Sequence, residues 1–186
     1  MNFNKHSNLE GQHAFLGASN YHWINYDEEK VVFVYNKRMA TLKGTELHEL
    51  AANLIRLGVK LPNSKKTLNA YVNDAIGFQM KPEQPLFYSE NCFGTADTID
   101  LKIKKRFLRI HDLKNGESPG SFNQLLIYMA LFCLEYDYRP TEIEAELRLY
   151  QLDDVQLHIP EPEQVLNIMD KIIRFDKAIE KTKIGG

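Results

Sequence analysis

The sequence has little cysteine, no long apolar run and almost no net charge. Its two cysteines, Cys92 and Cys133, are too few for a disulfide framework, a four-cysteine zinc site or an iron–sulfur cluster unless histidine or another subunit contributes. The longest apolar run, residues 125–134, is well short of the roughly 20 residues that a transmembrane helix needs, and no charged-then-apolar leader opens the chain. We therefore expect a cytoplasmic protein with no membrane segment.

The net charge of −2 argues against a surface coated with positive charge for nucleic acid, but the charges are unevenly distributed. Residues 60–114 hold ten Lys and Arg against six Asp and Glu, whereas residues 115–186 hold seven against thirteen. Residues 102–109 form the densest basic stretch. A local excess of this kind suits a groove that follows phosphate groups, and an ordinary solvated hairpin tip is the alternative.

The 186 residues, 44% hydrophobic and 11% aromatic, are enough to bury the core of one globular domain. Residues 1–15 are polar and compatible with a loosely tethered arm. Strand patterns are expected at residues 86–90, 93–103, 107–113 and 143–149. Helical patterns are expected at 45–57, at 67–78, from a cap at Ser118 or Ser121 to about residue 136, and at 161–180. This succession predicts an α/β fold over residues 1–186, with a central mixed sheet flanked by helices.

The helical pattern that Thr45 can cap carries a histidine at the edge of its apolar stripe. The helix is expected to stop at Gly58. His48 directly follows Leu47, the first residue of that stripe, so it can be partly buried and still reach the end of a neighbouring strand. Taken alone, His48 is better explained as a structural histidine.

Two expected strands each place an acidic residue in line with an aliphatic row. Asp97 has the same parity as Ile99, and Asp112 has the same parity as Ile110. A carboxylate that continues an apolar face is costly to bury without a cation. We therefore expect a positive group opposite both carboxylates, and a divalent metal ion would satisfy both.

The next helix carries two polar residues on an otherwise apolar surface. Gln124 and Tyr128 are four residues apart and therefore neighbours on one helix face. A DNA strand or a metal-bound water could supply their hydrogen-bond partners. Bonds from either side chain to the local backbone are the alternative.

In order along the chain, His48, Asp97 after Gly94-Thr95-Ala96, the Asp112-Leu113-Lys114 strand end, and Gln124 with Tyr128 form a recognisable pattern. This pattern resembles the RecB-type branch of the PD-(D/E)XK nuclease superfamily, which includes phage lambda-type exonucleases. The similarity covers roughly residues 43–136. It implies a restriction-endonuclease-like fold, and the shortage of cysteine favours the relatives without an iron–sulfur cluster.

The resemblance also implies a role for each residue. His48, Asp97, Asp112 and the backbone carbonyl of Leu113 would bind Mg²⁺ or Mn²⁺. Lys114 would orient or help deprotonate the attacking water, and Gln124 and Tyr128 would position the scissile strand. The catalytic residues that the resemblance implies are therefore Asp97, Asp112, Lys114, Gln124 and Tyr128.

A further acidic residue, Glu90, is a candidate for an outer contact or for a second metal, because it ends the strand before Asp97.

The function that the resemblance implies is a metal-dependent deoxyribonuclease, an exonuclease acting on linear DNA in recombination, repair or phage DNA processing. A structure-specific endonuclease is the nearest alternative. A DNA-end or junction-binding adaptor that keeps the nuclease fold, and an α/β protein with a purely structural acidic cluster, also stay open. A recombination or helicase partner protein and a homo-oligomer are both compatible with the sequence.

Overall fold

The computed structural model describes residues 14–16, 18–116 and 118–184, without the side chains of residues 18–21 and 184. The chain divides into two compact units, Met1–Lys43 and Gly44–Gly186. All the described strands and both hydrophobic clusters lie in the second unit. One domain over residues 1–186 therefore stays a prediction, and most of the arm expected at residues 1–15 lies outside the described residues.

The first unit contains the short 3-10 helix η2 (Ala18–Asn25) and the beginning of α1 (Glu28–Leu57). Asp27 caps α1, because its Oδ1 accepts a hydrogen bond of 2.8 Å from the backbone N–H three residues later. The predicted start at Thr45 is wrong, since Thr45 lies inside α1. The predicted end is confirmed: Gly58 has a φ of +66°, and its N–H donates to the carbonyl of Ile55.

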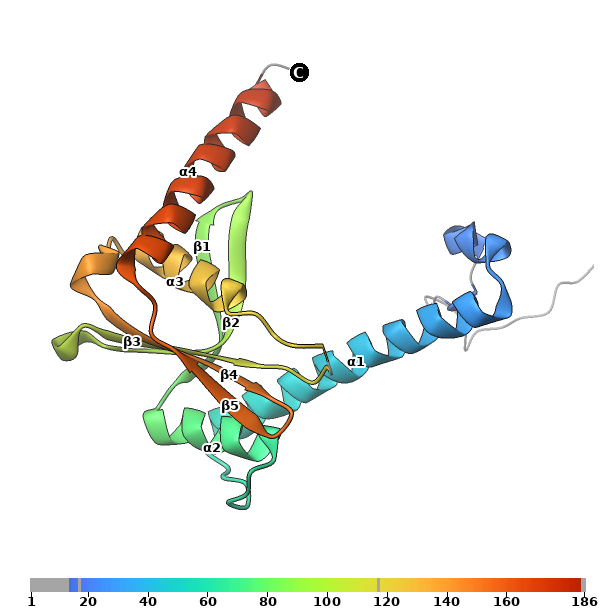
Figure 1. The fold of residues 1–186 in the computed structure, drawn as a ribbon, viewed down its shortest axis with the longest axis horizontal. Coiled ribbons are helices and arrows are strands. Elements are labelled where there is room, and N and C mark those ends of the chain that lie inside the picture. The colour runs from blue at the N-terminus through green and yellow to red at the C-terminus, as the bar shows by residue number, and fades with distance from the viewer. Residues whose placement is uncertain (1–13, 17, 117, 185–186) are drawn as a thin grey trace, which may run out of the picture. The chain divides into compact units, whose positions relative to one another are not determined.

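A five-stranded mixed sheet forms the centre of the second unit (Figure 1). Its strands, in spatial order, are β1 (Lys81–Ser89), β2 (Cys92–Lys102), β3 (Phe107–Leu113), β4 (Glu144–Gln151) and β5 (Asp154–His158). The β3–β4 pair is parallel and the other three pairs are antiparallel. The prediction of an α/β fold with a mixed sheet is confirmed.

Two strands differ from the sequence prediction. β1 begins at Lys81 instead of residue 86 and includes Pro82 and Pro85, which an edge strand tolerates because its outer side needs no backbone donor. β5 is not among the strands expected from the sequence. It follows a tight turn at Leu152 and Asp153, which have φ values of 52° and 58°.

Helices cover both faces of the sheet (Figure 1). On one face, α3 (Asn123–Glu135) and α4 (Pro162–Ile184) pack against a cluster that contains Ile99, Leu108 and Ile110. The aliphatic rows predicted for β2 and β3 therefore face α3. On the other face, α2 (Thr67–Phe78), whose bounds match the prediction, and the end of α1 form a second cluster around Leu113 and Tyr150.

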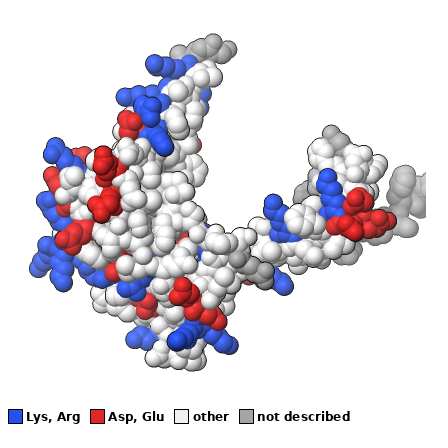
Figure 2. Space-filling model, in the orientation of Figure 1, with Lys and Arg blue, Asp and Glu red and all other residues white. Residues whose placement is uncertain are grey.

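Short 3-10 helices complete the connections: η3 (Ile103–Lys105) joins β2 to β3, and η4 (Pro140–Glu142) precedes β4. None of the described helices combines the length and hydrophobicity required to cross a bilayer. On the face in Figure 2, acidic and basic side chains are interspersed around the Gly44–Gly186 unit and do not separate into patches of one sign.

Candidate metal centre and its polar neighbours

Three side chains from α1, β1 and β2 converge on one point. His48, Glu83 and Asp97 each offer a ligand atom, and these atoms all lie within 4.8 Å of one another. His48 Nδ1 is 3.3 Å from Asp97 Oδ1. Hydrogen bonding to Asp97, followed by the charges of Asp97 and Asp112, raises the pKa of His48 against the opposing effect of burial. The imidazole of His48 is therefore paired with the carboxylate of Asp97.

The side chain of Asp97 accepts a hydrogen bond from the backbone of the neighbouring strand, β3. The β2–β3 register, Thr98 opposite His111, places Asp97 beside Asp112 at the next position. There the N–H of Leu113 donates to Asp97 Oδ2 at 2.8 Å. This bond fixes the carboxylate at the end of β3 and leaves Oδ1 directed to His48. A role for the Leu113 carbonyl as a ligand stays a prediction.

Glu83 is the member of this group that the sequence did not reveal. It lies on β1 between Pro82, which pairs with Thr98, and Gln84, which pairs with Ala96, and so it stands opposite Asp97. Its φ of 51° is unusual for a residue with a side chain. Burial and the charge of Asp97 raise the pKa of its carboxyl. Only the antiparallel register, which is not readable from local sequence, brings it to the site.

Glu90 was the expected additional acid, and the structure places it elsewhere. It lies in the turn between β1 and β2, next to Asn91 and Cys92. Asp97 is five residues further along β2 than Cys92, a distance of about 17 Å at roughly 3.3 Å per residue. The predicted contact of Glu90 with the metal site is therefore wrong.

A continuous polar chain joins the end of β3 to α3. Lys114 Nζ is 2.9 Å from Asp112 Oδ2 and donates to Gln124 Oε1 at 2.7 Å. Gln124 Nε2 in turn donates to the Tyr128 hydroxyl at 2.9 Å. The four residues Asp112, Lys114, Gln124 and Tyr128 are all residues for which the sequence predicted a role in one site. The structure brings them together.

Asp112 is the most deeply buried carboxylate of the site, with its side chain 1% exposed. Burial, and then the charge of Asp97, raise its pKa to about 6, although Lys114 and His48 favour the charged form. Asp112 is not one of the three residues whose ligand atoms converge, and its carboxylate is paired with Lys114. A role for Asp112 as a ligand stays a prediction.

Tyr128 approaches the backbone of β2 closely at Gly94. A Cβ atom added to Gly94 would lie 3.0 Å from Tyr128 Cε1, closer than side chains normally approach. The ring of Tyr128 therefore packs directly on the backbone of β2. Burial raises the pKa of its hydroxyl, which favours the protonated form that can donate a hydrogen bond.

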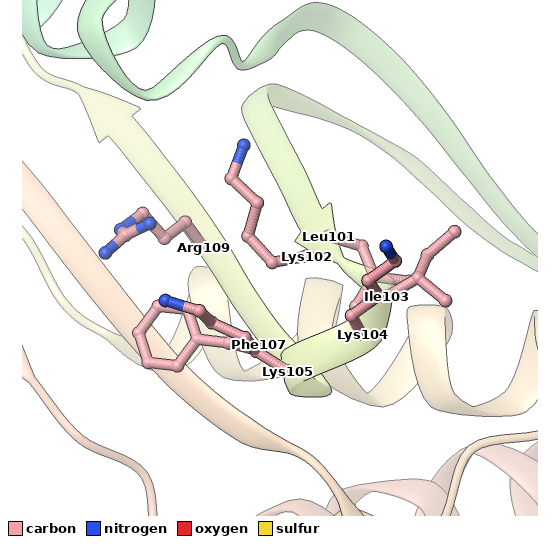
Figure 3. Close-up of a pocket in the computed structure, with 7 residues that line it drawn as sticks. All are labelled: Leu101, Lys102, Ile103, Lys104, Lys105, Phe107 and Arg109. Atoms are coloured by element: carbon pink, nitrogen blue, oxygen red, sulfur yellow. The ribbon is translucent and has the colours of Figure 1, made fainter.

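The basic stretch predicted at residues 102–109 forms a separate hollow at the β2–β3 turn (Figure 3). This hollow of about 580 Å³ is lined by four cations, Lys102, Lys104, Lys105 and Arg109, together with apolar side chains. Lys102 pairs with a carboxylate of β2 at 3.1 Å, and Arg109 with one of β4 at 3.2 Å. The turn lies at the end of β2 and β3 opposite Asp97 and Asp112, so this hollow is not part of the metal site.

Comparison of the chain with protein-family models and with curated proteins gives no match. Fold and site by themselves define an α/β protein with a candidate divalent-metal centre of one histidine and two carboxylates. A lysine held between an aspartate and a glutamine lies beside that centre.

Proposed function

We propose that the chain is a divalent-metal-dependent DNA nuclease with a restriction-endonuclease-like fold, of the RecB and lambda-exonuclease type within the PD-(D/E)XK superfamily. The observation that carries this proposal is the convergence of His48 and Asp97, from elements about fifty residues apart, next to the Asp112 and Lys114 strand end. The connection from β3 through α3 to a parallel β4 supports it as well. We place its action on linear DNA in the cytoplasm, in recombination, repair or phage DNA processing.

The residues present fit a divalent cation. One imidazole nitrogen and two carboxylates within 4.8 Å of one another make a donor set that suits Mg²⁺ or Mn²⁺. His48, Glu83 and Asp97 would hold the ion, and Asp112 would join them on release from Lys114. When bound, the cation supplies charge that stabilises the phosphoryl transition state and increases the acidity of a coordinated water.

The remaining residues act on the water and on the DNA strand. Lys114 Nζ, which lies between Asp112 and Gln124, orients the attacking water. Gln124 and Tyr128 present an amide and a hydroxyl side by side, and both groups can donate to phosphate oxygens. In this proposal, residues at the end of β3 activate the nucleophile and residues of α3 position the substrate.

Incubation of the protein with linear and covalently closed circular DNA tests the proposal. We expect linear DNA to be degraded with Mg²⁺ or Mn²⁺ and to survive with chelator, while closed circles persist. Cleavage of closed circles would favour the structure-specific endonuclease instead. Linear DNA that stays intact both with Mg²⁺ and with Mn²⁺ would overturn the proposed activity.

Lys114→Ala separates a nuclease from a DNA-end-binding adaptor or an acidic cluster that is purely structural. We expect cleavage to fall on the order of 100-fold or more, because the water loses its positioned partner, while DNA binding changes little. Single-turnover cleavage and a binding titration measure the two effects. Lys104→Ala, in the hollow at the far end of the strands, serves as the matched control. Equal cleavage by wild type and Lys114→Ala would remove Lys114 from the mechanism.

A further inference from the structure

A buried glutamine at the end of β4 holds the connection between β3 and α3. Gln151 is buried, with 5% of the residue exposed. Its Nε2 donates to the carbonyl oxygens of Gly116 and Ser118, and its Oε1 accepts the N–H of Gly120 at 2.8 Å. These three bonds fix the orientation of the amide. In the reverse orientation the side-chain NH₂ would face the N–H of Gly120, and the side-chain oxygen would face the carbonyl oxygens of Gly116 and Ser118.

The same strand end makes two more contacts with this connection. The carbonyl of Tyr150 accepts the N–H of Lys114 at 2.9 Å. A Cβ atom added to Gly120 would lie 2.6 Å from Leu149 Cδ2, so a larger residue would force the Leu149 side chain or the connection to move. Three successive residues of β4 therefore hold the connection at its first residue and near its end.

This connection determines where two site residues meet. Lys114 is its first residue, and Gln124 lies in the first turn of α3, immediately after it. Their contact, 2.7 Å from Nζ to Oε1, requires the end of β3 and the start of α3 to keep a fixed separation. Within the described connection, Gln151 is the side chain that bonds to the backbone at three residues between these two ends.

We propose that Gln151 is a positioning residue for catalysis: it holds the connection so that Gln124 meets Lys114. This role rests on the proposed nuclease function. Gln151 itself touches neither DNA nor metal, and its effect reaches the reaction only through the pair that it aligns. Replacement of Gln151 removes no metal ligand and no group that contacts DNA, and it alters only the position of Gln124 relative to Lys114.

Gln151→Met tests the role, because methionine has nearly the same length and removes all three hydrogen bonds. We expect kcat for cleavage of linear DNA to fall on the order of 100-fold, the effect of a displacement of about 1 Å at a reacting group. KM for DNA and the dissociation constant for Mn²⁺ should change by less than about threefold. Gln156→Met, an exposed glutamine on β5, is the matched control and should behave as wild type.

A double-mutant cycle distinguishes positioning from a general structural role. If Gln151 acts through Gln124, Gln151→Met should reduce kcat by less than about twofold in a Gln124→Ala background. A multiplied loss would show that it acts through general stability, and would overturn the proposal. Gly120→Ala disturbs the same contact from the opposite side and should reproduce the kcat loss, so a poorly folded Gln151→Met does not leave the question open.

The outcomes separate this inference from the function on which it rests. An active wild type with an equally active and folded Gln151→Met overturns the role of Gln151 alone. A wild type inactive on linear DNA with both metals overturns the nuclease and this role with it.

Discussion

The imidazole of His111, on β3, is fully buried and contacts the rings of Phe78 and Tyr150. Burial, and then the charges of Arg148 and Arg109, lower its pKa to about 3. The ring is therefore neutral in the fold and becomes charged on unfolding below about pH 6.5. The unfolding free energy is therefore unaffected by His111 titration above about pH 6.5, and it decreases as the pH falls from there toward 3.

His111→Asn should remove this pH dependence. Relative to wild type, the variant should lose about 2 kcal/mol less unfolding free energy between pH 7 and pH 5. Asp112, with its pKa raised to about 6, has the opposite dependence between about pH 4 and 6, so the comparison must be made between wild type and variant. Urea unfolding at the two pH values measures it, and parallel losses in the two proteins would contradict the assignment.

Two glutamates, one on β1 and one in the turn that follows it, provide a test of the metal site and its control. Glu83 converges with His48 and Asp97, whereas Glu90 lies in the hairpin turn. We expect Glu83→Gln to weaken Mn²⁺ binding on the order of tenfold or more and Glu90→Gln to leave it unchanged. Calorimetric titration measures both. Equal affinities for the two variants would exclude Glu83 as a ligand.

Among the site residues, the sequence reveals those that continue the apolar face of a strand. The alternation along β2 and β3 correctly aligned Asp97 and Asp112 with the aliphatic residues that pack on α3. Glu83 follows no such pattern, because it lies between residues that pair in the ladder and near two prolines. Its place depends on a strand pairing that only the folded sheet defines.

Glycine is favoured at the end of α1 and disfavoured in the interior of α2. Gly58 has a φ of +66°, whereas Gly77 lies in helical α2 with open space around its Cα. We expect Gly58→Ala to reduce the unfolding free energy by about 1 kcal/mol, and Gly77→Ala to raise it by about 0.5 to 1 kcal/mol. Chemical denaturation measures both changes. A stabilising Gly58→Ala would contradict the assigned helix end.

Predictions of elements succeeded where local signals are strong. The bounds of α2 and β3 were correct, since apolar periodicity and turn residues define both ends. The start of α1 was missed because its first half is polar and includes a β-branched run that favours strands in isolation. β5 was missed because Val155 and Leu157 remain exposed on an edge strand and form no apolar face.

For the whole molecule, the sheet order follows from the connections, whereas the site depends on long-range contact. Short turns join β1 to β2 and β2 to β3, and a crossover through α3 makes β4 parallel to β3. His48 reaches Asp97 from a helix 49 positions earlier in the chain. The residue types at the site were readable from the sequence, but their convergence needed the packing of α1 against the sheet.

Location of Mn²⁺ by anomalous diffraction from crystals of the protein tests the central claim most directly. We predict a peak at coordination distance from His48, Glu83 and Asp97, with Asp112 turned toward the ion. His48→Ala serves as the control and should lose or weaken that peak. Crystals with Mn²⁺ bound only elsewhere, or with no peak among these residues, would contradict the metal centre and the nuclease built on it.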